Sequence, residues 1–139
     1  RANKQQIQLS MTPPTALPFV YADIALTERV LENLIENAFT HTPVSGVIRL
    51  GLNKTEAGIV ISVEDNGCGI TPEDIDHIFD PFFQSGRKQT AGEHAGLGLA
   101  IAKRIMTLQQ GDIQVTSTLG SGTRFSILLP LAETFIPAD

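Results

Sequence analysis

Two pairs of short alternating segments place the strongest constraint on how this chain can fold. Val47–Asn53 and Ile59–Asp65 each alternate apolar and polar residues, and a short turn joins them. Ile113–Ser117 and Thr123–Leu129 repeat this pattern around the glycine-rich loop 119–122. Alternation with a period of two indicates a strand with one buried face, and two such strands joined by a short turn form an antiparallel hairpin. A sheet made only of parallel strands is therefore excluded, because parallel neighbours need longer crossover connections.

A long helix is predicted between the N-terminal segment and the first hairpin. Asp23 is suited to the N-cap, and the helix is expected to run to about His41, before Pro43. Its apolar residues recur at helical spacing and form one face: Val30, Leu31, Leu34, Ile35 and Ala38. Upstream of Asp23, two short strands are expected near Ile7–Met11 and Phe19–Tyr21, joined by a proline-containing loop.

Two further helices are predicted between the hairpins. Thr71-Pro72-Glu73-Asp74 carries a capping threonine, a proline at the first helical position and an acidic residue three positions after the cap. Gly98–Gln110 has helical periodicity, with Gly111 expected at its C-terminal end. Its inward residues are expected to be Ile101, Ile105 and Leu108. The resulting order predicts an α/β (α+β) two-layer sandwich, in which helices pack on one face of a mixed, mostly antiparallel sheet.

Length and composition limit the class of protein. A chain of 139 residues with 42% hydrophobic and 18% charged residues is expected to form one globular domain. Its formal net charge of -5 argues against a nucleic-acid partner, which requires a basic surface. The single cysteine excludes an internal disulfide framework and suits a reducing compartment. Because the chain starts with Arg1, we expect it to be a piece of a longer protein.

Two asparagines in the long helix form the first candidate site. Asn33 and Asn37 are four residues apart, so they lie on one helical face next to the apolar stripe. Their carboxamide oxygens suit a hard cation such as Mg²⁺, and their amides can donate to a phosphate. The alternative is a solvated polar face. Asparagine is a mediocre helix former, however, so two in register call for a reason.

The second candidate site follows the strand that ends at Asp65. Asp65 shares the face of Ile59, Ile61 and Val63, so its carboxylate is expected at the end of a buried face, where it needs a donor. An adenine amino group is a suitable donor, and the glycines of Asp65-Asn66-Gly67-Cys68-Gly69 let the backbone pass close under a flat ligand. The alternative is a glycine turn that Asp65 closes as an Asx turn.

Two glycine motifs complete the candidate sites. Gly96-Leu97-Gly98-Leu99-Ala100-Ile101 runs into a helix, where exposed backbone N–H groups can cradle a phosphate. The lysine of a Walker A loop is absent, and a hinge before a core helix is the alternative. The polar segment 84–95 before this motif predicts a mobile loop. For Gly120-Ser121-Gly122-Thr123, an ordinary hairpin turn is the simplest interpretation on local grounds.

The order of these motifs resembles the ATP-binding catalytic domain of two-component sensor histidine kinases, in the superfamily shared with gyrase, Hsp90 and MutL. Glu32–Ala38 is similar to the N box, and Val63–Ile70 is similar to the G1 box. Ile78–Phe83 resembles the F box, Gly96–Ile101 the G2 box, and Gly120–Thr123 the last glycine motif. The resemblance covers essentially the whole chain and implies a Bergerat-type ATP-binding fold.

The resemblance implies a role for each matching residue. Asn37 would bind Mg²⁺, Asn33 would lie beside the phosphates, and Asp65 would accept a hydrogen bond from the adenine amine. The lid over ATP would be residues 84–95, with Phe79, Phe82 and Phe83 anchoring its near end. The catalytic pair would be Asn33 and Asn37, and the residues implied in ATP binding are Asn33, Asn37, His41, Asp65, Gly67, Gly69, Ile70, Phe79, Phe82, Arg87, Lys88, Gly96, Leu97, Gly98, Leu99 and Thr123.

Departures from the family pattern remove two positive charges expected near the phosphates. Thr40 stands where the family usually has Lys or Arg, and Gln84 stands where a basic residue often follows the F box. His94 replaces the first glycine of the usual G2 pattern. Our hypothesis is that Arg87 or Lys88 in the lid supplies charge instead; the alternative is that both are solvated.

The function implied by the resemblance is ATP-dependent phosphotransfer in two-component signalling. The chain would hold Mg-ATP and donate the γ-phosphate to a histidine on a separate dimerisation and phosphoacceptor domain, expected N-terminal to Arg1. None of the three histidines lies in the context of the family's phosphoacceptor helix, so little autophosphorylation is expected of this chain alone. A response regulator and a homodimeric full-length protein are the expected partners, with no nucleic acid and no membrane contact by this chain. The domain is expected in the cytoplasm, and the full-length protein in the bacterial inner membrane.

Three other functions compete with this prediction. An ATPase of the gyrase or MutL kind would carry a glutamate where this chain has Asn33, and Glu32 lies about 100° round the helix from that position. A serine kinase of the anti-sigma type is disfavoured by the F box and the compact lid. A degenerate module that has lost ATP and only docks partners remains open because of Thr40 and Gln84.

Overall fold

The helices and strands occur in the order that the sequence predicts. The computed structural model describes residues 8–12, 23–43, 45–83 and 97–131, so the strand expected at Phe19–Tyr21 lies outside the described residues. The described elements are β1 (Gln8–Thr12), α2 (Ile24–His41), β2 (Val47–Lys54), β3 (Gly58–Asp65), α3 (Pro72–Ile75), α4 (Gly98–Leu108), β4 (Asp112–Thr118) and β5 (Gly122–Pro130).

The strands form one mixed sheet in the order β1-β2-β3-β5-β4. β1 runs parallel to β2, and every other neighbouring pair is antiparallel. Both predicted hairpins are present, β2–β3 and β4–β5. Because β5 pairs with β3, the first hairpin lies beside the second, and Asp65 at the end of β3 lies opposite Thr123 at the start of β5.

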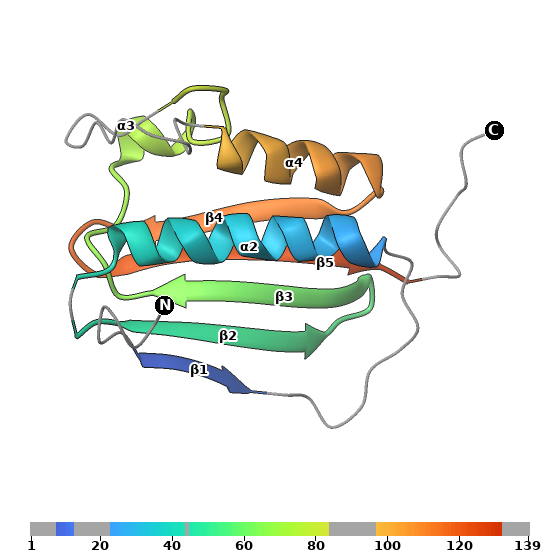
Figure 1. The fold of residues 1–139 in the computed structure, drawn as a ribbon, viewed down its shortest axis with the longest axis horizontal. Helices are drawn as coiled ribbons and strands as arrows, with labels where there is room; N and C mark the ends of the chain where they lie inside the picture. Colours follow the sequence, from blue (N-terminus) through green and yellow to red (C-terminus); the bar gives the residue numbers. More distant parts are fainter. Residues whose placement is uncertain (1–7, 13–22, 44, 84–96, 132–139) are drawn as a thin grey trace.

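The helices cover one face of this sheet, as predicted for a two-layer sandwich. Figure 1 shows α2 lying over the sheet with α4 beside it. The buried core between the layers includes Val30, Leu34 and Ala38 of α2, Ile48 of β2, Val63 of β3, and Phe125 and Ile127 of β5. Among the described residues, no helix combines the length and the hydrophobicity that a membrane span requires.

Capping residues fix where α2 and α3 begin, as the sequence predicts. The Asp23 side chain accepts a hydrogen bond from the Leu26 N–H at 2.9 Å, so it is the N-cap of α2. Thr71 caps α3 by accepting from the Asp74 N–H. Each cap satisfies one of the N–H groups that a helix N-terminus leaves without an internal partner.

Hydrogen bonds near both ends of α4 hold α2 and α4 in an antiparallel arrangement. Near the N-terminus of α4, the Asn33 amide donates to the Gly98 carbonyl at 3.1 Å. Near the C-terminus of α4, the buried Gln109 side chain accepts from the Asp23 N–H and donates to the Thr27 hydroxyl. Because both sets of hydrogen bonds join the same two helices, the helix that carries Asn37 and the helix that starts at Gly98 are held in a defined relative position.

The prediction that Leu108 faces the core is wrong. Leu108 is 61% exposed, whereas Ala102, Ile105 and Met106 are buried, so the inward stripe lies about one residue round the helix from the predicted one. The helix also ends at Leu108 rather than Gln110, and Gln110 takes the left-handed conformation with φ 61°. The Gly111 N–H donates to the Met106 carbonyl and the Gln110 N–H to the Thr107 carbonyl, so the helix ends in a Schellman motif.

We predict that Met106→Ala and Leu108→Ala differ strongly in stability. Met106 is fully buried, so removing its side chain is expected to lower the free energy of unfolding by about 2–5 kcal/mol. Leu108→Ala is the matched control, with an expected change within about 0.5 kcal/mol. Urea unfolding of both variants measures the difference, and a loss on Leu108→Ala as large as that on Met106→Ala would contradict this assignment of the helix faces.

Candidate functional site

Asp65 occupies the buried end of β3, as the alternation predicts. It is only 5% exposed, and its Oδ1 accepts a hydrogen bond from the Gly67 N–H at 2.8 Å. This contact is the Asx turn considered as the alternative interpretation, so the turn is present. Each carboxylate oxygen has two lone pairs, and the bond to Gly67 therefore leaves acceptor capacity for a ligand.

Burial raises the pKa of Asp65 above its ordinary value of 3.8, because the charged carboxylate loses hydration there. Three neighbours act in the opposite direction: the Gly67 N–H, the charge of His41 and the Thr123 N–H, while the charge of Glu64 raises the pKa further. The net rise means that these groups do not replace the lost water fully. A ligand that offers an N–H donor to this carboxylate would complete its solvation.

The glycines after Asp65 are required by close backbone contacts. A Cβ on Gly67 would lie 2.1 Å from the His41 carbonyl oxygen at the end of α2. Gly69 has φ +79°, and a Cβ there would lie 2.4 Å from the Thr118 carbonyl oxygen. The backbone of this turn therefore passes between the C-terminus of α2 and the β4–β5 turn, with no room for a side chain at either contact.

Two polar residues that the sequence reading did not single out hold this turn in place. The Asn66 side chain accepts from the Val47 N–H at 2.8 Å, at the start of β2. Ser117 of β4 accepts from the Ile70 N–H at 2.7 Å and lies 2.9 Å from the hydroxyl of Thr123. Their roles depend on contacts between distant segments, and a β-strand serine carries no local signal that could have revealed them.

The two asparagines of α2 lie on one side of the helix and are partly exposed. Both are half-buried, one helical turn apart. Asn33 is committed to the Gly98 carbonyl, so it joins α2 to the glycine motif that begins α4. Asn37 lies closer to the C-terminal end of α2, where His41 and Gly67 meet. The helix thus connects the surroundings of Asp65 to the N-terminus of α4.

The N-terminus of α4 has no side-chain cap. Its N-cap residue is Leu97, whose apolar side chain cannot accept a hydrogen bond, in contrast to Asp23 and Thr71 at the other helices. The first N–H groups of a helix have no internal partner, and the helix dipole favours an anion there. A Cβ on Gly98 would approach Asn33 no closer than 3.8 Å, so packing does not require glycine at this position. Leu99 next to it packs against the core.

The phenylalanines expected to anchor the lid differ in burial. Phe79 packs edge-on against Phe125 with ring centroids 6.2 Å apart, and the Lys103 amine lies 5.2 Å from the centroid of its ring. Phe83 packs against the core and stacks on His77. Phe82, by contrast, is 70% exposed and has φ 66°. Only two of the three rings therefore fix the chain that leads to residue 84.

Several predicted site residues lie outside the described residues. These are the lid, residues 84–95, with Arg87, Lys88 and His94 in it, and Gly96 of the G2 box. Most of the other predicted residues lie on three elements: the C-terminal half of α2, the turn after β3, and the N-terminus of α4. Thr123 lies on β5, and Phe79 and Phe82 follow α3.

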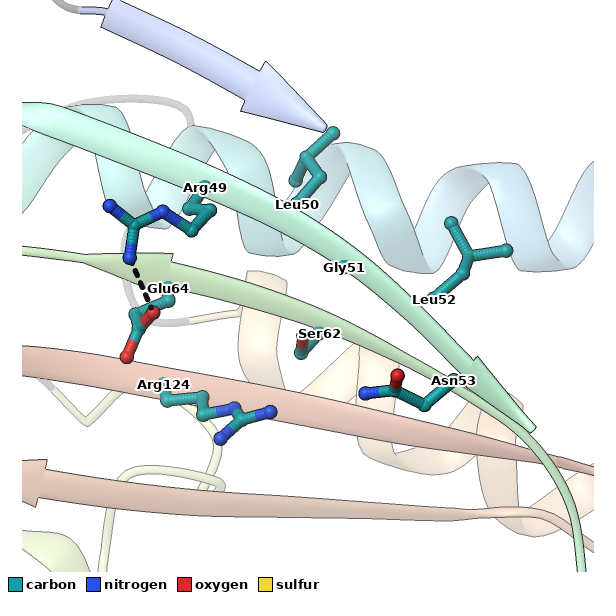
Figure 2. A pocket seen from close by; sticks show the side chains of 8 residues that line it. All are labelled: Arg49, Leu50, Gly51, Leu52, Asn53, Ser62, Glu64 and Arg124. Carbon is teal, nitrogen blue, oxygen red and sulfur yellow. Dashed lines mark ion pairs between the residues drawn. The ribbon is translucent and has the colours of Figure 1, made fainter. Parts of the chain in front are cut away.

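Two hollows mark the sheet. One of about 290 Å³ lies at the ends of β3 and β4 and the start of β5. Its lining includes Asp65, Ser117 and Thr123, and it shares Glu64 and Arg124 with the other hollow. The other, of about 220 Å³, lies on the sheet face away from the helices (Figure 2), where Arg49 pairs with Glu64 at 3.6 Å. Side chains alternate between the two faces of a strand, so this second hollow is separated by the sheet from the Asp65 carboxylate.

Asn37 is the residue that the sequence predicts for a magnesium site. Within the described ranges, no group of three or more His, Cys, Asp or Glu side chains could hold a metal ion. Mg²⁺ is commonly bound by one or two protein oxygens together with substrate phosphates and water. The carboxamide oxygen of Asn37 therefore fits Mg²⁺ that is also held by phosphates.

Comparison with known proteins identifies a family. The family described as histidine kinase-, DNA gyrase B- and HSP90-like ATPase matches residues 22–133. The chain is 39% identical over 131 residues to the alginate biosynthesis sensor protein KinB of Pseudomonas aeruginosa, covering 94% of this chain and 22% of that protein. It is 39% identical over 130 residues to the sensor histidine kinase ZraS of Escherichia coli K12, covering 94% of this chain and 27% of that protein. The chain thus spans about a quarter of the length of these relatives.

Solved structures show the same fold. The mycobacterial sensor histidine kinase MprB superposes with a TM-score of 0.78 at 26% identity, over 93% of this chain and 87% of that one. Full-length ShkA in complex with AMPPNP superposes with a TM-score of 0.82 at 30% identity, over 99% of this chain and 28% of that one. The predicted two-layer sandwich is therefore confirmed by the sheet topology of this chain and by these solved structures.

We predict that Asp65→Asn stabilises the fold at neutral pH. A carboxyl whose pKa is raised on folding costs stability once it is ionised, and the cost disappears as the pH falls toward 3.8. The amide keeps an oxygen that can accept from the Gly67 N–H but carries no charge. The melting temperature of the variant should exceed that of the wild type at pH 7, and the two should converge as the pH falls.

The control is Glu32→Gln, which removes an exposed carboxylate from α2. It should leave the pH dependence of the melting temperature unchanged. A lower melting temperature for Asp65→Asn at pH 7 would show that the charge of Asp65 stabilises the fold, contrary to this account.

Proposed function

This chain belongs to the family of histidine kinase-, DNA gyrase B- and HSP90-like ATPases, and on that basis we propose that it binds Mg-ATP and donates the γ-phosphate to a histidine on a separate domain of a sensor kinase. The observation that carries the proposal is the buried carboxylate of Asp65, which retains acceptor capacity beside a tight turn that contains Gly67 and Gly69. The AMPPNP bound to the structural relative ShkA supports an adenine nucleotide as the ligand.

The base is held at the end of β3 in this proposal. Asp65 accepts a hydrogen bond from the adenine amine, which supplies the donor that burial has removed. Gly67 and Gly69 allow the turn to pack closely against the His41 and Thr118 carbonyls, which sets the backbone beside the ring, and Ile70 contributes apolar surface. His41 and Thr123 border the same carboxylate.

The phosphates extend along α2 toward the N-terminus of α4. The uncapped N–H groups of α4 and its dipole attract them, with Leu97, Gly98 and Leu99 at the contact. Asn33 positions this end of α4, and Asn37 supplies the protein oxygen that would hold Mg²⁺. When bound, Mg²⁺ neutralises phosphate charge, so the contribution of the protein is mainly positioning and electrostatic stabilisation.

Phosphotransfer is favoured over hydrolysis by the residue at position 33. ATPases of the gyrase or MutL kind carry a glutamate at this position that polarises the attacking water, and a carboxamide is a far weaker proton acceptor than a carboxylate. The amide of Asn33 is moreover bonded to the Gly98 carbonyl, and the neighbouring Glu32 is exposed to solvent. An ATPase of the gyrase or MutL kind therefore has no suitable base here among the described residues.

The remaining parts of the proposal concern the longer protein. A dimerisation and phosphoacceptor domain N-terminal to this chain would provide the histidine, and a response regulator would receive the phosphoryl group. The chain by itself is proposed to bind nucleotide with little autophosphorylation, as one cytoplasmic domain of a homodimeric inner-membrane protein. Residues 84–95 are proposed as the lid, with Phe79 and Phe83 at its base and Arg87 or Lys88 supplying positive charge.

We predict distinct effects of Asn37→Ala and Asp65→Ala on nucleotide binding. Calorimetry with a non-hydrolysable ATP analogue should give micromolar to sub-millimolar binding to the wild type, and Asp65→Ala should abolish it with or without Mg²⁺. Asn37→Ala should weaken binding only when Mg²⁺ is present, because its role is to hold the metal. Absence of binding by the wild type would replace this function with that of a docking module.

We also predict that Gly98→Ala separates binding from folding. Among the described residues, no atom comes closer than 3.8 Å to the added methyl group, and alanine is the better helix former, so stability should be kept. Affinity for the ATP analogue should fall, because the methyl group would stand where the phosphates approach the backbone. Thr107→Ala, at the other end of α4, is the control for both measurements, and an undiminished affinity in Gly98→Ala would remove Gly98 from the phosphate site.

A further inference from the structure

Ser117 lies at the centre of a hydrogen-bond network that joins three parts of the site. Its Oγ is 2.7 Å from the Ile70 nitrogen, 2.9 Å from the Gly122 carbonyl oxygen and 2.9 Å from the Thr123 hydroxyl oxygen. These partners belong to the turn after β3 and to the start of β5. Ser117 also pairs directly with Thr123 across the β4–β5 hairpin, and Thr123 pairs in turn with Asp65.

Counting protons assigns a direction to each of these bonds. A serine hydroxyl has one proton to donate and two lone pairs that accept. The Ile70 N–H can only donate, and the Gly122 carbonyl can only accept, so Ser117 accepts from Ile70 and gives its one proton to Gly122. The contact with Thr123 is then a hydrogen bond only if the Thr123 hydroxyl donates to Ser117.

This assignment determines what Thr123 can offer to a ligand. Its only proton is directed at Ser117, so toward any further partner its hydroxyl oxygen is solely an acceptor. The neighbouring Asp65 carboxylate is also an acceptor, and directly paired residues on antiparallel strands have Cβ atoms about 4.5–5.5 Å apart. Two adjacent acceptors suit a group with N–H donors, such as an exocyclic amine. They repel a carbonyl oxygen, which is itself an acceptor.

We propose that Ser117 is a positioning residue that makes the site select an amine-bearing purine over a carbonyl-bearing one, by keeping Thr123 an acceptor. This inference rests on the proposed function, in which the adenine amine meets Asp65. It adds a source of selectivity that neither Asp65 nor Thr123 carries alone, because a threonine hydroxyl that is free to rotate can donate to a carbonyl. Without Ser117, Thr123 could turn its proton toward the ligand.

A purely structural role for Ser117 makes a different prediction. The bond to Ile70 also holds the glycine turn against β4, so its loss could loosen the whole site. Such loosening would lower the affinity for every purine nucleotide by a similar factor. A change in base preference is therefore the readout that separates the two roles.

The test compares ATP with inosine triphosphate, which carries a carbonyl oxygen where ATP carries the amine. Calorimetry with Mg²⁺ is carried out on the wild type, Ser117→Ala and Ser117→Thr. The wild type should prefer ATP, and Ser117→Ala should reduce that preference by between about twofold and about tenfold, the range expected for one hydrogen bond. Ser117→Thr keeps a hydroxyl and should restore the preference.

Ser126→Ala removes a serine hydroxyl from β5 on the other sheet face and is the matched control, with an unchanged preference. If Ser117→Ala does not fold, Ser117→Cys takes its place with the same expected reduction. If Ser117→Ala loses affinity for ATP and inosine triphosphate by the same factor, the selectivity role is overturned and the proposed function stays intact. A wild type that binds neither nucleotide would overturn the proposed function and this inference with it.

Discussion

The candidate site depends on one buried charge, the carboxylate of Asp65. A carboxylate that is 5% exposed must be solvated by the protein or by a ligand, and the fold directs the surrounding backbone toward it. The Gly67 N–H donates to it directly, and Thr123 is brought opposite by the register of β3 and β5. Burial raises the pKa of Asp65, so a donor from outside the chain would stabilise its ionised form.

The proposed nucleotide site also requires that the groups near the base and the groups near the phosphates are held in a fixed relative position. α2 meets this requirement because its C-terminus contacts the turn after β3 at Gly67, while Asn33 bonds to the first residue of α4. Gln109 fixes the other end of the same helix pair to Asp23. A nucleotide that spans from Asp65 to the N-terminus of α4 would therefore meet groups whose relative positions are set before it arrives, and binding would not have to order them.

The sequence predicts most of this fold because the signals are local. The hairpins follow from alternation, and the starts of α2 and α3 follow from their capping residues. The position of Asp65 on a buried face also follows from alternation. The network around Ser117 could not be predicted, because it depends on which strands pair and in what register. The prediction that Leu108 faces the core is wrong because two sets of apolar residues in α4 have helical spacing. One contains Ile101, Ile105 and Leu108, and the other, which is the buried one, contains Ala102, Ile105 and Met106.

The measurement that tests the central claim most directly is an NMR titration of the backbone amides with Mg²⁺ and a non-hydrolysable ATP analogue. If Asp65 and the N-terminus of α4 form one nucleotide site, the largest shifts will occur at Gly67, Gly69, Thr123 and Gly98, on the helix-covered side of the sheet. The amides of Arg49 and Ser62, at the hollow on the opposite face, will change little. Saturable shifts centred on that opposite face, or no saturable shifts at all, would contradict the account.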